Sequence, residues 1–180
     1  MHELERAVHV SAPPGFEALA HHLGVFAHAV HNQGVERSST QQAHILAAPE
    51  TVWDLVGDPN RHPDWWPEML ETDCADLEEG CRYRGVVKGP FGAEDHELLI
   101  ERLEGCEEVS IFCDGTGVTT RFRLTEAQGG TFVEGYFAIE PGSLGMKMIG
   151  AVVGRRYLRS WLERSLQNLK RAAEQTPAPS

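Results

Sequence analysis

Apolar and polar positions follow two different periods along the 180-residue chain. In the first forty residues one apolar set recurs at steps of three and four: Phe16, Leu19, Leu23, Phe26 and Val30. This spacing predicts an amphipathic helix over residues 13–31, and the polar run NQGVERSST at 32–40 predicts a linker. We therefore expect residues 1–40 to form an N-terminal helical extension. Its stripe needs an apolar surface to lie against, and the main domain, a pocket mouth and a second subunit all meet that need.

From residue 41 onward the period changes to two, in short runs separated by turns that contain glycine. Alternation of this kind is typical of strands, and connections of three to five residues are typical of hairpins. The predicted strands are 41–48, 68–77, 81–87, 93–103, 108–114, 118–125 and 131–140. The pattern therefore predicts an antiparallel meander of about seven strands.

Helical patterns occur at only three places in this second part. Residues 49–57 predict a short helix with Pro49 at its start, and Asp58 caps a second one that Pro63 ends. A long C-terminal helix runs to about Glu174, with one buried stripe: Leu158, Trp161, Leu162, Ser165 and Leu169. Residues 175–180 predict a disordered tail.

The segment before the long helix, PGSLGMKMIGAVVGRR at 141–156, is rich in glycine and methionine. Small residues and flexible thioethers suit an adaptable pocket mouth, for which Met146, Met148 and Ile149 are candidate ligand contacts. The alternative is a loop that becomes helical only near Gly154.

Three stretches in this order resemble a known superfamily: AAPETVWDLVGDPNRHPDWWP, GGTFVEGYFAIEP and LERSLQNLKRAAE. They are similar to the START and Bet v 1-like (SRPBCC) superfamily, in particular its bacterial polyketide cyclase/dehydrase and lipid-transport branch. The resemblance covers residues 41–174 and implies an α+β helix-grip fold. In that fold a curved antiparallel sheet wraps around the C-terminal helix, two short helices close one end, and an internal cavity binds a hydrophobic molecule.

Side-chain alternation predicts which residues face this cavity. The predicted inward set is Leu98, Ile100, Ile111, Phe122, Val133 and Phe137. Trp65 and Trp66 in the short-helix region either both pack in the core, or one plugs it while the other lines the pocket.

Two polar residues share the predicted inward face. His96 is the leading acid/base candidate because imidazole titrates near neutral pH, and Tyr83 can donate its phenolic hydrogen to a carbonyl. A histidine satisfied within the core is the competing interpretation. The hypotheses that stay open are a cyclase or dehydratase, a carrier or sensor without catalysis, and an interaction protein with a vestigial pocket.

Charge and composition narrow the remaining classes. The chain carries 16 Lys and Arg against 27 Asp and Glu, so a phosphate backbone is repelled and we expect no nucleic-acid partner. In the last forty residues basic side chains outnumber acidic ones. The basic face from Arg155 to Arg171 is either a contact for an acidic carrier protein or a solvated helix surface. The absence of an export signal or a long apolar run predicts a cytoplasmic protein without membrane insertion.

No metal or cofactor is expected. Only His28 and His31 in the extension are spaced for a shared ion, and a polar outer helix face is the simpler explanation. Four cysteines lack zinc-type spacing and are expected as thiols: Cys74, Cys81, Cys106 and Cys113.

Overall fold

The computed structural model describes residues 37–89, 92–140, 143 and 154–176. The predicted N-terminal helix, His28 and His31, and the candidate contacts Met146, Met148 and Ile149 lie outside the described residues.

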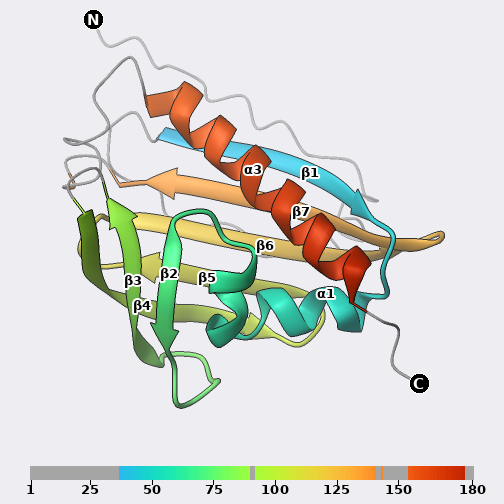
Figure 1. Ribbon diagram of the computed structural model, residues 1–180, viewed down its shortest axis with the longest axis horizontal. Coiled ribbons are helices and arrows are strands. Elements are labelled where there is room, and N and C mark those ends of the chain that lie inside the picture. Colours follow the sequence, from blue (N-terminus) through green and yellow to red (C-terminus); the bar gives the residue numbers. More distant parts are fainter. Residues whose placement is uncertain (1–36, 90–91, 141–142, 144–153, 177–180) are drawn as a thin grey trace, which may run out of the picture. The chain divides into compact units, whose positions relative to one another are not determined.

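A seven-stranded antiparallel sheet forms the framework, in the order β1-β7-β6-β5-β4-β3-β2 (Figure 1). The strands are β1 (Arg37–Ile45), β2 (Met69–Asp73), β3 (Arg82–Gly89), β4 (Gly92–Glu104), β5 (Glu108–Cys113), β6 (Val118–Ala127) and β7 (Gly130–Ile139). From β2 to β7 each strand pairs with its neighbour in sequence, and β1 closes onto β7. The predicted meander is confirmed.

The first strand begins and ends earlier than its sequence pattern predicts, since it spans Arg37–Ile45 and not 41–48. β1 begins at Arg37, within the run that predicts a linker, and pairs with β7 from Arg37 opposite Ile139 to Ile45 opposite Thr131. The segment SSTQQ is polar, so its composition resembles a linker. The backbone ladder of β7 nevertheless supplies partners for the whole strand, because ladder hydrogen bonds do not depend on side-chain polarity.

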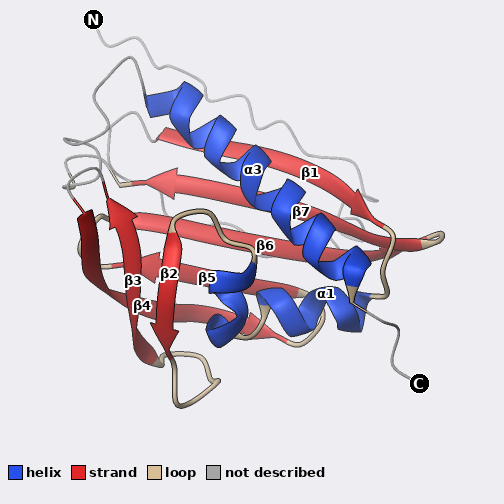
Figure 2. Ribbon diagram, viewed as in Figure 1, coloured by secondary structure: helices blue, strands red, loops and turns tan. Residues whose placement is uncertain are grey.

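The helices lie where the sequence pattern places them (Figure 2). They are α1 (Pro49–Val56), the short 3-10 helix η1 (Pro59–Asp64) and α3 (Gly154–Gln175). Asp58 Oδ1 accepts a hydrogen bond of 2.9 Å from the Asn60 backbone N–H, which is the predicted cap. All five predicted stripe residues of α3 are buried, and α3 lies against β1 and β7.

Helix α3 packs closely on the sheet at Gly135 in β7. A Cβ atom at this position would lie 2.8 Å from Leu162 Cδ1 and 3.3 Å from Phe122 Cε1. Because Gly135 has no side chain, α3 packs directly against the backbone of β7 at this point.

No helix in the described part of the chain is both long enough and apolar enough to cross a membrane.

Candidate functional site

The inner face of the sheet carries the side chains that the alternation rule selects. Leu98, Ile100, Ile111, Phe122, Val133 and Phe137 are all buried. The register places Ile100 opposite Ile111, and Tyr83 opposite Leu98, so these residues share one face. The structure confirms their orientation, whereas contact with a ligand stays a prediction.

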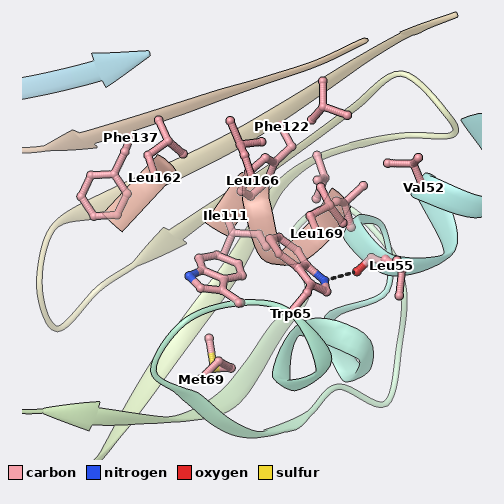
Figure 3. Packing of buried hydrophobic residues seen from close by; sticks show 14 of the residues in the cluster. Val52, Leu55, Trp65, Met69, Ile111, Phe122, Phe137, Leu162, Leu166 and Leu169 are labelled. Carbon is pink, nitrogen blue, oxygen red and sulfur yellow. Dashed lines mark hydrogen bonds between the residues drawn. The ribbon is translucent and has the colours of Figure 1, made fainter. Parts of the chain in front are cut away.

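Both tryptophans of the short-helix region belong to the hydrophobic core, and Figure 3 shows Trp65 among the buried side chains. Trp65 and Trp66 stack with ring centroids 5.6 Å apart, and Trp66 also meets Trp161 of α3 edge to face at 5.6 Å. The Trp65 indole N–H donates to the Leu55 carbonyl at 2.9 Å. Trp65 is 2% exposed and Trp66 is 8% exposed, so both pack in the core.

Tyr83, in β3, has a polar group that the core does not satisfy. Its side chain is buried, and its hydroxyl has no hydrogen-bond partner within the described residues. Burial raises the pKa of Tyr83 above its ordinary value, and the nearby thiols of Cys74, Cys113 and Cys81 raise it further. The phenol is therefore a neutral hydrogen-bond donor at physiological pH.

His96, in β4, lies on the same face as Tyr83. It pairs with Gly85 while Tyr83 pairs with Leu98, which makes the two side chains diagonal neighbours across the strands. The His96 side chain is 15% exposed, and its Nε2 lies 3.7 Å from Glu94 Oε2. The structure thus brings the two predicted catalytic candidates together, with a carboxylate beside the imidazole.

The outer face of the same strands is charged. Arg82 pairs with Glu97 at 2.7 Å and with Asp114, and Arg84 pairs with Asp95 at 2.5 Å. An open pocket of about 400 Å³ lies here, lined by Asp73, Arg82, Tyr83, Arg84, Asp95, His96 and Glu97. Its charged side chains lie on the outer face, but Tyr83 and His96, whose side chains lie on the inner face, also line it, so the pocket borders both candidate residues.

Glu68 is a site residue that sequence reasoning missed. Its backbone is left-handed, with φ of 64°, and its carboxylate accepts from Trp161 Nε1 at 2.9 Å and pairs with Arg164 at 3.1 Å. The Glu68 carbonyl also accepts from the Lys88 backbone N–H at 2.7 Å. Glu68 therefore ties the start of β2 to β3 and α3 beside Trp66, and no local pattern signals this because its partners are distant in sequence.

The four cysteines are free thiols. Burial, and the neighbouring Cys81 thiol, raise the pKa of Cys74 to about 11, so this thiol is unreactive. Among the described residues no three His, Cys, Asp or Glu side chains gather in a group that could hold a metal ion.

The family model described as polyketide cyclase / dehydrase and lipid transport matches residues 36–174 of this chain. A search of curated proteins found no match to this chain.

Solved structures with the same fold were found at low sequence identity. The di-domain ARO/CYC BexL from the BE-7585A biosynthetic pathway aligns with a TM-score of 0.61 at 18% identity, over 79% of this chain and 51% of its own. This chain thus spans about half of BexL. SA2116 from Staphylococcus aureus, a protein of unknown function, aligns with a TM-score of 0.60 at 17% identity, over 77% of this chain and 94% of its own. DR_A0006 from Deinococcus radiodurans gives a TM-score of 0.56 at 17% identity, over 76% and 96%. At these identities the likeness establishes the fold.

Proposed function

Because this chain belongs to the polyketide cyclase/dehydrase and lipid transport family, we propose that it binds a hydrophobic small molecule, such as a polyketide or a lipid, against the inner face of its sheet. The observation that carries the proposal is the combination on this face of apolar side chains from several strands with two polar groups. Such a lining is typical of small-molecule sites, where a few polar groups orient an otherwise apolar ligand.

The region near Tyr83 and His96 is the place for this site. Helix α3 lies on β1 and β7, and Trp65 and Trp66 pack on Phe122 of β6, so the inner surface beyond them belongs to β3, β4 and β5. The inner residues of β3 are Tyr83, Gly85 and Val87. The Leu98 side chain occupies the space above Gly85, since a Cβ there would lie 2.6 Å from Leu98 Cδ1.

Ligand uptake tests the proposal directly. Purified protein should increase the fluorescence of N-phenyl-1-naphthylamine, a neutral lipophile, and native mass spectrometry after exposure to a cell extract should detect a bound apolar molecule. Val87→Trp should reduce uptake at least about fivefold because the larger ring occupies the inner face next to His96. Lys88→Trp places the same ring on the outer face of β3 and should leave uptake unchanged. Lack of uptake by the unmodified protein, in both assays, would refute the proposal.

Catalysis is a second candidate function, favoured by the position of His96 beside Glu94 and diagonal to Tyr83. A flexible poly-β-ketone held on this face would lose a proton to the imidazole while Tyr83 donates a hydrogen bond to the carbonyl that becomes an enolate.

His96→Ala separates the enzyme from the carrier. With a linear poly-β-ketone as substrate, the substitution should lower the rate of cyclised product formation by at least about a hundredfold, the usual contribution of a general base. The free energy of unfolding should change by no more than about 1 to 2 kcal/mol. Cyclisation by the unmodified protein no faster than in buffer would leave the carrier function alone.

The basic face of α3 keeps its proposed role as a contact for an acidic carrier protein. Three of its cations already have partners within the molecule: Arg159 pairs with Glu163, Arg164 with Glu68 and Lys170 with Glu174. Arg156 and Arg171 are exposed and are the residues on which such a contact would depend.

A further inference from the structure

The Tyr83 hydroxyl is unusual because it is buried without a partner. The residue is 4% exposed, and its oxygen forms no hydrogen bond with any described residue. Buried polar groups in folded proteins are nearly always paired, since an unpaired group keeps the full cost of its lost hydration. A side chain that bears this cost in the free protein has a hydrogen bond to offer to a ligand.

The side chains around this hydroxyl are an aliphatic group and several thiols. Leu98 lies opposite Tyr83 in β4, and Cys113 lies opposite Leu98 in β5. The thiols of Cys74 and Cys81 are also near the phenol and contribute to the rise of its pKa. Thiols are weak hydrogen-bonding groups, so the phenolic O–H is the one strong neutral donor among these residues.

The charged groups nearby do not favour an anion. Arg82 and Arg84 flank Tyr83 in sequence, but they lie on the opposite face and are paired with carboxylates there. On the inner face the neighbouring charge is the carboxylate of Glu94, beside His96. Arg164 of α3 is paired with Glu68. Among the described residues, a ligand carboxylate next to Tyr83 would therefore lose its hydration without gaining an unpaired Lys or Arg side chain, and such a transfer is strongly unfavourable.

We propose that this site selects apolar ligands that carry a neutral oxygen acceptor, a ketone carbonyl above all, and rejects carboxylates of the same chain length. The proposal rests on the proposed function, because it names the ligand class of the same inner face. A neutral carbonyl oxygen accepts the Tyr83 hydrogen bond and remains uncharged, whereas a fatty-acid carboxylate brings a charge that the site does not compensate. Tyr83 is a specificity-determining residue in this proposal.

Three competitors of equal chain length test the selectivity. Undecane, 2-undecanone and undecanoate should each be titrated at pH 8 against protein loaded with N-phenyl-1-naphthylamine. We expect 2-undecanone to displace the probe at concentrations about fivefold lower than undecane, which is the typical gain from one hydrogen bond. Undecanoate should compete more weakly than 2-undecanone by at least about tenfold, because its burial is uncompensated.

Tyr83→Phe isolates the hydroxyl. The variant should bind undecane as the unmodified protein does and lose the preference for 2-undecanone. Tyr136→Phe is the matched control, since Tyr136 lies in β7 on the outer face with Arg121 4.7 Å above its ring, and it should keep the preference. Because Tyr83→Phe removes a buried group without a partner, its thermal midpoint should equal or exceed that of the unmodified protein.

Each outcome decides a different question. If the probe and all three competitors fail to bind, the proposed function fails and the selectivity falls with it. If they bind with undecanoate the strongest, or if Tyr83→Phe retains the ketone preference, the selectivity is refuted while the proposed function stands. A clear loss of thermal stability in Tyr83→Phe would also refute it, because the hydroxyl would then have a partner within the protein.

Discussion

His62 is an imidazole enclosed by the molecule on every side. It is fully buried, and its Nε2–H donates to the Val56 carbonyl at 3.0 Å. Its ring centroid lies 4.8 Å from that of Trp66 and 5.6 Å from that of Trp65, and its Nδ1 has no partner among the described residues. Burial lowers the pKa of His62 to about 4. The hydrogen bond to Val56 and the charge of Asp58 act in the opposite direction, but their effect is smaller.

The lowered pKa predicts a loss of stability in mild acid. Well above pH 6.5 His62 is neutral in both the folded and the unfolded chain, so it adds no pH dependence there. Between pH 6.5 and 4 the unfolded chain takes up a proton that the folded chain does not, and the free energy of unfolding falls as pH falls. From pH 7 to pH 5 we expect a loss of about 2 kcal/mol from this residue, measurable by urea denaturation at both pH values.

His62→Phe is the control for this effect, because it preserves a ring between the tryptophans but cannot titrate. It lowers stability at pH 7 by removing the hydrogen bond to Val56, and it should lose about 2 kcal/mol less than the unmodified protein between pH 7 and pH 5. Equal losses in the two proteins would contradict the assignment to His62.

At the residue scale the sequence identifies types of side chain better than their partners. Adjacent indoles between prolines predict large buried rings, and both tryptophans are indeed buried. The sequence does not show that the Trp65 indole donates a hydrogen bond to the Leu55 carbonyl. Only the folded arrangement of α1 and η1 brings these two groups within 2.9 Å of each other. The lack of partners at Tyr83 is equally invisible in a sequence, because a hydroxyl is unpaired only in relation to its three-dimensional neighbours.

At the scale of elements, the contact between α3 and β7 depends on the absence of one side chain. Gly135→Ala introduces a Cβ at 2.8 Å from Leu162 Cδ1, so helix or sheet has to shift. We expect the free energy of unfolding to fall by about 1 to 3 kcal/mol, the usual cost of overpacking. Chemical denaturation at pH 7 measures it.

Gly105, in the turn between β4 and β5, is the matched control. Apart from its chain neighbours, no atom of the described residues lies within 4 Å of the point that a Cβ would occupy there, and its backbone is not left-handed. Gly105→Ala should therefore be neutral or slightly stabilising, because alanine restricts the unfolded chain. If both substitutions have the same effect, close packing at Gly135 is not the cause.

The elements themselves could be predicted closely, for a physical reason. Strands such as β4 alternate apolar and polar side chains, and a period of two fixes both the strand and the face of each residue. The start of β1 could not be found this way, since its first residues are polar on both faces. Glu68 was equally hidden, because the indole that it binds lies 93 residues away.

In the molecule as a whole, the two faces of the sheet differ in chemistry: the outer face carries ion pairs, and the inner face carries apolar side chains. On the outer sides of the strands, Arg82, Arg84 and Arg102 are each paired with carboxylates. The inner face contributes about half of the buried apolar residues, and the helical segments contribute most of the others. The family and fold could be expected from three sequence stretches, whereas the ligand class had to be inferred from the arrangement of a few groups around Tyr83.

The position of β1 also has a consequence for biosynthesis. Translation delivers this strand first among those of the sheet, but its pairing partner is β7, the last to be made. Until the ribosome has made β7, the segment RSSTQQAHI has no strand to pair with, and its backbone N–H and C=O groups are open to pairing with other nascent chains. Its polar composition, which disguises it as a linker, gives it little tendency to aggregate during this interval.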